Sequence, residues 1–162
     1  MVSLRPATRD DDELVHRVYE STRAGEFARL GWSEAQLALF LKMQHDARQR
    51  GYAQQFPAAQ LSIVIDGGEP AGTLHVERAT EAIRLVDIAL LPERRGAGIG
   101  AYLIKELQVE AARAGVPVRL QVALGNPAQR LYQRLGFVRT GGGEVHEAME
   151  WRPPAPSAAL SR

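Results

Sequence analysis

The segment from Pro92 to Gly100, PERRGAGIG, constrains the fold of this 162-residue chain more than any other segment. Before it lies an apolar, β-branched run from Ile83 to Leu91, which predicts a strand. After it, apolar residues recur at helical spacing, at Ile99, Leu103, Ile104 and Leu107. The sequence therefore predicts a strand that leads into a helix through a glycine-rich turn.

This turn has the features of a pyrophosphate-binding loop. A helix N-terminus exposes unpaired backbone N–H groups and carries a partial positive charge, and both favour anions. Gly96, Gly98 and Gly100 would let a ligand approach the backbone with no side chain in the way. Arg94 and Arg95 add positive charge at the same place. An ordinary glycine-rich turn between a strand and a helix is the alternative.

Two common phosphate-binding folds fit the sequence less well. Residues 96–101 satisfy the G-x-G-x-x-G/A pattern of dinucleotide-binding folds. Those folds place an acidic residue about 20 positions further on, where it binds the ribose. Here no Asp or Glu lies between Glu110 and Glu144. The G-x-x-x-x-G-K-[ST] loop of ATP-binding proteins is absent.

Two segments match the sequence signatures of one enzyme family. Arg95–Gly100 (RGAGIG) fits the pattern R/Q-x-x-G-x-G/A. Asn126–Phe137 places an Asn at a helix start, followed by Leu-Tyr and then by Gly-Phe. In this order and at this separation, the two signatures resemble those of the GCN5-related N-acetyltransferase (GNAT) family. The resemblance is clear from about Leu61 to Trp151.

The resemblance implies an α/β fold of the GNAT type, in a single domain over residues 1–152. Its central mixed sheet would have six to seven strands, would be flanked by about four helices, and would splay between the fourth and fifth strands. Residues 153–162 are rich in Pro and Ala, which predicts a disordered tail.

Apolar patterns, turn residues and capping residues place the elements of this fold. The predicted strands are Val2–Pro6, Leu61–Asp66, Ala71–Arg78, Ile83–Leu91, Val118–Leu124, Phe137–Thr140 and Val145–Trp151. Two predicted helices open at the capping boxes Thr8–Asp11 and Ser33–Gln36, a third follows the glycine-rich turn, and a fourth has Asn126 as its N-cap and Pro127 as its first residue. Gly51, Gly115 and Gly136 would end the second, third and fourth helices.

By resemblance, acetyl-CoA is the co-substrate and lies between the strands Leu85–Leu91 and Val118–Leu124. The backbone of Ile88 and Leu90 would hold the pantetheine arm like an added strand, and the Leu90 N–H would polarise the thioester carbonyl. The pyrophosphate would accept backbone N–H groups from Arg95, Gly96, Ala97, Gly98, Ile99 and Gly100. Asn126 would contact the pantetheine region, serve as a plain N-cap, or do both.

Tyr132 is the expected general acid, because the family uses the Tyr of this motif to protonate the departing thiolate. A phenol with a pKa near ~10 stays protonated at neutral pH and can protonate a thiolate. Packing beside Ala128 and Leu135 is the alternative role for this ring.

The general base is less defined by the sequence. Many family members carry a glutamate early in the fourth strand, where this chain has residues 83–86 without an acid. Asp87 is the nearest acid, so it is either catalytic or a structural hydrogen-bond acceptor. His75, Glu77 and a chain of water molecules are weaker candidates.

Composition excludes other kinds of chemistry. The chain has no cysteine and no G-x-S-x-G motif, which favours direct attack of the amine in a ternary complex over a covalent acyl-enzyme. Its four histidines have no metal-ligand spacing, so no metal is predicted. We find no run of 18 apolar residues and no signal-peptide pattern, and therefore expect no membrane partner and a cytoplasmic protein.

Charge is unevenly distributed along the chain. Residues 94–143 carry eight Arg or Lys and two acids, although the whole chain has a formal net charge of only +1. This basic region suits a phosphate-containing donor. It lacks the interleaved aromatic residues of a nucleic-acid-binding surface, so no nucleic-acid partner is expected.

The acceptor would be a primary amine on a small molecule or a protein, and the protein a monomer or a homodimer. Phe27, Trp32, Phe40 and Tyr52 either line the acceptor site or belong to the core. A non-catalytic acyl-CoA-binding sensor or interaction module is the alternative function.

Overall fold

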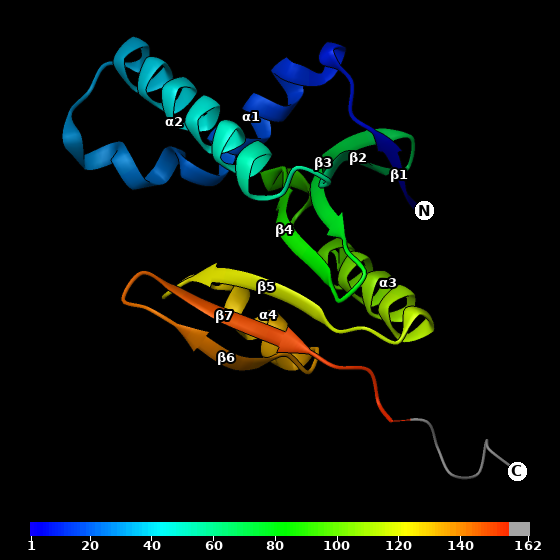
Figure 1. Cartoon of the computed structure of the whole chain (residues 1–162). Helices are drawn as coiled ribbons and strands as arrows, with labels where there is room; N and C mark the ends of the chain where they lie inside the picture. Colours follow the sequence, from blue (N-terminus) through cyan, green and yellow to red (C-terminus); the bar gives the residue numbers. More distant parts are fainter. Residues whose placement is uncertain (156–162) are drawn as a thin grey trace, which may run out of the picture. The chain divides into compact units, whose positions relative to one another are not determined.

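The strands pair in the order β1-β2-β3-β4-β5-β7-β6 in a computed structural model that describes residues 1–155 (Figure 1). The strands are β1 Val2–Pro6, β2 Gln60–Asp66, β3 Glu69–Arg78, β4 Ile83–Leu90, β5 Val118–Ala123, β6 Val138–Gly142 and β7 His146–Trp151. The α-helices are α1 Asp12–Arg23, α2 Glu34–Gln55, α3 Ile99–Ala114 and α4 Ala128–Arg134. Three short 3₁₀ helices are η1 Arg9–Asp11, η2 Ala24–Leu30 and η3 Pro92–Arg94.

The sheet is mixed, as the sequence predicts. β1, β2 and β3 pair antiparallel, and β7 pairs antiparallel with both β5 and β6. β4 and β5 are parallel, and their pairing joins Ile83–Leu85 to Val118–Leu120. The prediction of a GNAT-type α/β fold with a mixed sheet is confirmed, and the parallel pair lies at the fourth and fifth strands, where the splay was predicted.

The chain forms two compact units. The first comprises residues 1–77 and 86–100, and the second comprises residues 78–85 and the chain from 101 onward. In the first unit, α1 and α2 contact each other (Figure 1). Val18 and Ile63 are fully buried there. In the second unit, Ile104 and Val118 are fully buried. The prediction of a single domain over residues 1–152 stays a prediction, and most of the predicted tail lies outside the described residues.

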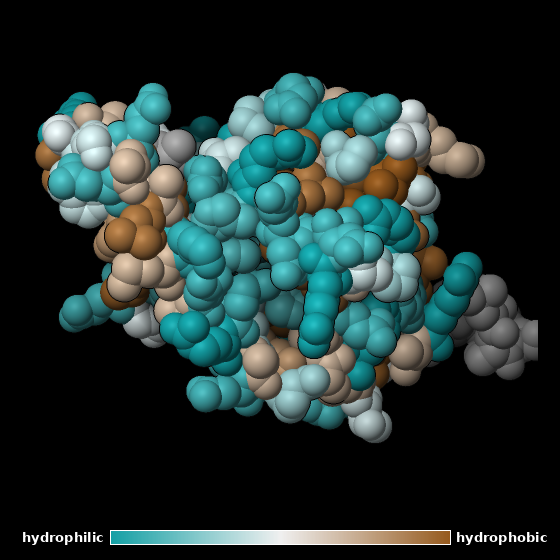
Figure 2. Space-filling model, turned by 90° about the horizontal axis from the view of Figure 1, so that it is seen from above, coloured by the Kyte–Doolittle hydropathy of each residue, from teal (hydrophilic) through white to brown (hydrophobic). Residues whose placement is uncertain are grey.

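The buried core is almost entirely apolar, but several large apolar side chains lie at the surface. Leu30, Trp32, Leu39 and Met43, all in or near η2 and α2, are exposed to solvent. The face seen from above in Figure 2 is correspondingly a mixture of hydrophilic residues and separate apolar patches. Scattered apolar residues of this kind are normal on protein surfaces and need no ligand to explain them.

α2 begins where the sequence predicts and ends later. Ser33 and Gln36 form the expected capping box, in which the Gln36 N–H donates to Ser33 Oγ at 3.1 Å. The prediction that Gly51 lies beyond the helix end is wrong, because α2 continues to Gln55. The helix stops where Pro57 follows Phe56, since the residue before a proline is disfavoured in the helical conformation.

Asp11 joins β1 to the start of α1. Its two carboxylate oxygens accept from Arg5 Nη1 at 2.9 Å and Arg5 Nη2 at 2.8 Å, and Oδ2 also accepts the Thr8 N–H at 2.8 Å. The hydrogen bonds from Arg5, followed by that from Thr8, hold the pKa of Asp11 well below its usual range. The ionised carboxylate is therefore a link between two elements of the first unit.

We expect Asp11→Asn to lower the Tm at pH 7, because the amide cannot accept both guanidinium hydrogen bonds as a carboxylate does. Since folding lowers the pKa of Asp11, the wild-type stabilisation is present above the unfolded-state pKa of about 4 and is lost as the pH falls below it. The Tm difference between the two proteins should therefore shrink at low pH. Thermal melts between pH 3 and pH 7 measure it, and an equal difference throughout would contradict the ion-pair account.

Candidate functional site

The glycine-rich segment forms an open turn between β4 and α3. Gly96 and Gly98 have φ angles of +77° and +84°, which favour glycine over any residue with a Cβ. A Cβ at either position would meet no atom within 4 Å, so the space beside this backbone is open. Local sequence explains the turn, because η3 begins at Pro92 and the helix α3 starts directly after Gly98.

Several consecutive backbone N–H groups of this turn have no partner. Among residues 1–155, no acceptor is found for the N–H groups of Gly96, Ala97, Gly98 and Ile99. The Arg95 N–H, by contrast, donates to the Pro92 carbonyl at 3.3 Å and closes η3. Four donors in a row at the N-terminus of a 16-residue helix are the arrangement that binds an anion such as a phosphate.

The two arginines of the turn are held by other parts of the first unit. Arg94 Nη1 lies 3.2 Å from Asp66 Oδ2, so its positive charge is paired with a carboxylate. Arg95 Nε donates to the Leu90 carbonyl at 3.0 Å, and its Nη2 donates to the Ser21 carbonyl at 3.4 Å. The carboxylate that pairs with Arg94 lies 28 residues earlier in the chain, and the prediction that both arginines add positive charge at the turn stays a prediction.

The end of β4 lies very close to β3. A Cβ on Gly72 would be 2.1 Å from the Ala89 carbonyl oxygen and 2.9 Å from Leu90 Cα. The Leu91 N–H donates to the Ala71 carbonyl at 2.8 Å just beyond this point. Gly72 thus allows the backbone of β4 to adopt its position at Ala89 and Leu90, in the segment predicted to hold the donor.

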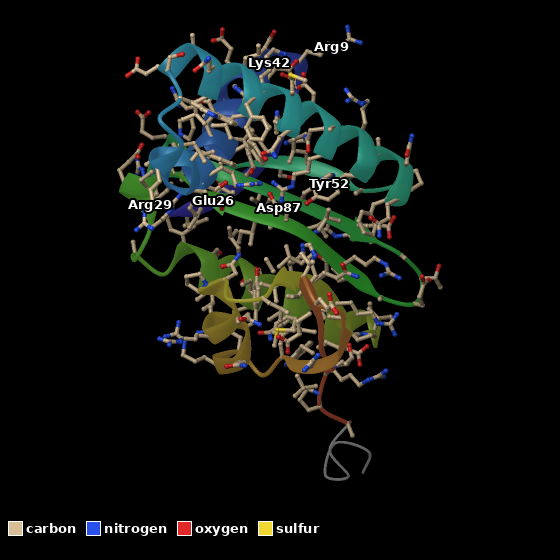
Figure 3. All side chains as sticks on the ribbon, turned by 90° about the vertical axis from the view of Figure 1, so that its left-hand side faces the viewer. Arg9, Glu26, Arg29, Lys42, Tyr52 and Asp87 are labelled. Atoms are coloured by element: carbon tan, nitrogen blue, oxygen red, sulfur yellow. The ribbon has the colours of Figure 1, made fainter. Side chains whose placement is uncertain are left out.

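Asp87 has a charged partner that the sequence did not reveal. Arg48 Nη2 donates to Asp87 Oδ1 at 2.9 Å, and Arg48 Nε donates to the Tyr52 hydroxyl at 2.8 Å. Figure 3 shows Tyr52 on α2 and Asp87 on β4 close together between the helix and the strand. Arg48 and Tyr52 are four residues apart on α2 and so share one face of the helix, but no sequence pattern links either of them to Asp87.

His75 belongs to the same group of side chains. Its ring lies 5.4 Å from the ring of Tyr52, and it sits on β3 beside β4. Burial lowers the pKa of His75, against a smaller opposing effect of the Asp87 charge, and burial also raises the pKa of Tyr52. At pH 7 the histidine is therefore neutral and the phenol is protonated. The structure thus brings together Asp87, His75 and Tyr52, whereas Glu77 lies two residues further along β3.

The second unit contains the other two predicted site residues. Asn126 Oδ1 accepts the Ala128 N–H at 2.9 Å, but Asn126 is not the N-cap of the helix as predicted. The helix α4 begins at Ala128, so Pro127 is its N-cap rather than its first residue as expected. The Asn126 amide nitrogen has no hydrogen-bond partner within the described part of the chain. Tyr132 is only 7% exposed, and its ring lies 5.7 Å from that of Phe137.

A buried carboxylate next to α4 is a feature that sequence reasoning missed. Glu147, on β7, accepts from Gln129 Nε2 at 2.5 Å and lies 3.7 Å from Arg139 Nε. Its partners come from α4 and β6, so no local pattern could have paired them.

Three of the four predicted aromatic residues pack together. The ring of Phe40 packs edge-on against two other rings. Its centroid lies 5.2 Å from the centroid of Phe27 and 5.0 Å from that of Trp32. Tyr52 instead contacts Phe56 and His75. The structure therefore separates Tyr52, beside Asp87, from an aromatic cluster at η2 and the start of α2.

Within residues 1–155, no group of three or more His, Asp or Glu side chains is arranged to hold a metal ion. In the same residues, each helix is too short or too polar to cross a membrane.

Comparison with known proteins points to one family. The family model described as "Acetyltransferase (GNAT) domain" matches residues 57–139, just over half of the chain. No curated protein matches the chain in sequence. Among solved structures, the chain is similar to PaiA N-acetyltransferase from Thermoplasma acidophilum in complex with coenzyme A, with 18% identity and a TM-score of 0.69 over 94% of this chain and 99% of that one.

Two further structures share the fold at somewhat higher identity. An acetyltransferase from Thermus thermophilus is 22% identical, with a TM-score of 0.64 over 94% of this chain and 97% of that one. The structure described as histone acetyltransferase HPA2 and related acetyltransferase, from Corynebacterium glutamicum, is 24% identical, with a TM-score of 0.60 over 97% and 98%.

Proposed function

Because the chain belongs to the acetyltransferase (GNAT) family, we propose that it transfers an acetyl group from acetyl-CoA to a primary amine. The observation that carries this proposal is the open turn at Gly96–Ile99, whose four consecutive N–H groups lack partners within residues 1–155. A diphosphate is the part of coenzyme A that such donors would bind. The amine would attack the thioester directly in a ternary complex.

Backbone groups would hold the donor. The N–H groups of Gly96, Ala97, Gly98, Ile99 and Gly100 would bind the diphosphate, with Arg95 contributing its nearby positive charge. Ile88 and Leu90 would bind the pantetheine arm through their main chain, and the Leu90 N–H would polarise the thioester carbonyl. The Asn126 amide nitrogen would add a contact to the same arm. The close approach of Gly72 to Ala89 and Leu90 supports a fixed position for this part of β4.

Proton transfer requires a base and an acid. The acceptor enters as an ammonium and loses two protons, while a C–N bond forms and the C–S bond breaks. Asp87 would accept the first proton, with His75, neutral at pH 7, as the alternative base. Tyr132 would supply a proton to the departing thiolate, and the second proton of the amine would restore the phenol, so that one proton is released overall.

In this proposal the acceptor is an amine on a small molecule or on a protein. The protein would act as a monomer or a homodimer, in the cytoplasm. A non-catalytic acyl-CoA sensor would bind the donor equally well. The two functions differ in turnover, so turnover is the quantity to measure.

A screen of acetyl-CoA against a broad amine panel tests this function. We expect acetyl-CoA to raise the Tm of the protein, because a ligand that binds only the folded state stabilises it. At least one amine should then release free thiol and give an N-acetylated product of the expected mass. Donor binding without turnover on any amine would favour the sensor, and no thermal shift would contradict both functions.

We expect Gly98→Ala to weaken acetyl-CoA binding by about 10-fold, because a Cβ at φ +84° costs roughly 1–2 kcal/mol of strain in the donor-binding conformation. Calorimetric titration with acetyl-CoA measures the affinity. Gly115→Ala is the matched control, since Gly115 also has a positive φ of +71° but lies after the end of α3. Equal affinities for the two variants would mean that the turn does not hold the donor.

A further inference from the structure

We infer that the acceptor carries a carboxylate next to its amine, as an α-amino acid does, and that Arg48 and Asp87 bind these two groups. The inference rests on the proposed acetyl transfer and names the class of acceptor. It draws on the group of side chains around Asp87, all of which lie in the first unit.

Arg48 and Asp87 each retain an unused polar atom. Their contact uses only Nη2 of the guanidinium and Oδ1 of the carboxylate. Arg48 Nε is taken by the Tyr52 hydroxyl. For Arg48 Nη1 and Asp87 Oδ2, residues 1–155 supply no hydrogen-bond partner. The ion pair thus keeps one donor and one acceptor for which the described residues supply no partner.

Both side chains are accessible to a ligand. The Arg48 side chain is 34% exposed and the Asp87 side chain is 26% exposed. Such a half-buried position strengthens a charge-assisted hydrogen bond relative to one in bulk water.

The guanidinium is held in place before any ligand arrives. Its central carbon lies 5.1 Å from the centre of the Tyr52 ring and 5.4 Å from the centre of the Tyr19 ring, both within the range of cation–π contacts. Together with the hydrogen bond to Tyr52, these rings restrict the side chain and reduce the entropy that binding would cost. A surface arginine that only balanced the charge of Asp87 would not need this support.

The charges favour a zwitterion over a simple amine. The ammonium group of a simple amine would be attracted by Asp87, but it would also be repelled by the guanidinium that lies 2.9 Å from the same carboxylate. An α-amino acid presents an ammonium to Asp87 Oδ2 and a carboxylate to Arg48 Nη1, so each charge meets its opposite. The carboxylate would accept a charge-assisted hydrogen bond from Arg48 Nη1, the one guanidinium nitrogen for which residues 1–155 supply no acceptor.

The position of Asp87 fits this role within the proposed reaction. It immediately precedes Ile88–Leu90, the segment of β4 that would hold the acyl donor. An amine bound at Asp87 would therefore lie near the donor-binding part of the strand, next to the carboxylate that would take its proton.

Matched acceptors test the inference. We would measure thiol release from acetyl-CoA with the common amino acids, with the corresponding amino-acid amides and with the decarboxylated amines. The best amino acid should exceed its own amide and amine in kcat/KM by about 10- to 100-fold, the usual effect of one charged hydrogen-bonding contact. Transfer to amides and amines with no preference for a carboxylate would overturn the inference and leave the proposed acetyl transfer intact. A protein that acetylates nothing in the panel would contradict the proposed function itself.

Variants of Arg48 test the same contact. Arg48→Gln should reduce kcat/KM for the amino acid about 10- to 100-fold more than it reduces kcat/KM for the amide, so that the preference for a carboxylate is lost. Arg48→Lys, which keeps the charge and most of the packing, should retain part of the preference even if Arg48→Gln folds poorly. Circular dichroism and the affinity for acetyl-CoA check that each variant is folded. A preference that survives in both variants would overturn the role of Arg48.

Discussion

Replacement of Gly72 with alanine is expected to lower the stability of the protein by about 3 kcal/mol and its Tm by roughly 6–12 °C. The added Cβ would lie 2.1 Å from the Ala89 carbonyl oxygen, a distance at which the backbone itself must move. No flexible side chain can absorb the clash, because both of its closest neighbours are backbone atoms of β4. We expect acetyl transfer to fall with stability, since Leu90 belongs to the same stretch of strand.

The rate of acetyl transfer by Gly72→Ala should fall by more than the unfolded fraction of the variant accounts for. At temperatures where Gly72→Ala is still folded, a displaced Leu90 would no longer offer its N–H to the thioester carbonyl. Thermal melts, together with thiol-release kinetics at about 15 °C below the variant's Tm, separate the two effects. If Gly72→Ala has a lowered Tm but transfers acetyl groups at the wild-type rate when folded, the position of β4 is not critical for transfer.

Gly51→Ala is a matched control for this prediction. Gly51 lies inside α2, has no positive φ, and has open space where a Cβ would be. Alanine is the better helix former by about 1 kcal/mol, so this variant should be as stable as the wild type or more so. If both glycine variants were destabilised alike, steric contact would not be the cause for Gly72.

The order of the elements could be predicted because their signals are local. Glycine turns and capping boxes mark where one element ends and the next begins. The capping box at Ser33 is present as expected, and Gly115 has a positive φ directly after α3 as expected. The end of α2 was misplaced because a glycine can either end a helix or lie within it. Pro57 was the stronger signal, since it acts on the conformation of the residue before it.

The candidate site could be predicted only where it is local in sequence. The turn at Gly96 and Gly98 follows from its own residues, since glycine alone adopts their φ angles at no cost. The ion pair of Arg48 with Asp87 joins residues 39 positions apart, and the contact of Gly72 with Ala89 is between backbones. Patterns of residue type carry no information about such contacts, because many pairings of distant residues are equally compatible with one pattern.

The hydroxyl of Tyr132 is expected to matter for catalysis far more than for stability. Tyr132→Phe keeps the ring that packs 5.7 Å from Phe137 and removes the hydroxyl that is the proposed proton donor. Without that donor, the thiolate of coenzyme A must leave unprotonated or take its proton from water. We therefore expect kcat to fall by about 100-fold, the usual contribution of a general acid, while the affinity for acetyl-CoA is retained.

Steady-state kinetics and a titration with acetyl-CoA measure these two quantities separately. Tyr102→Phe is the matched control, because Tyr102 is an exposed residue of α3 that has no role in the proposal. A large fall in kcat for Tyr132→Phe alone, with both proteins binding the donor normally, assigns the loss to the chemical step rather than to folding or binding. An unchanged kcat would remove Tyr132 as the acid, because a packing role survives the substitution and a proton-donating role does not.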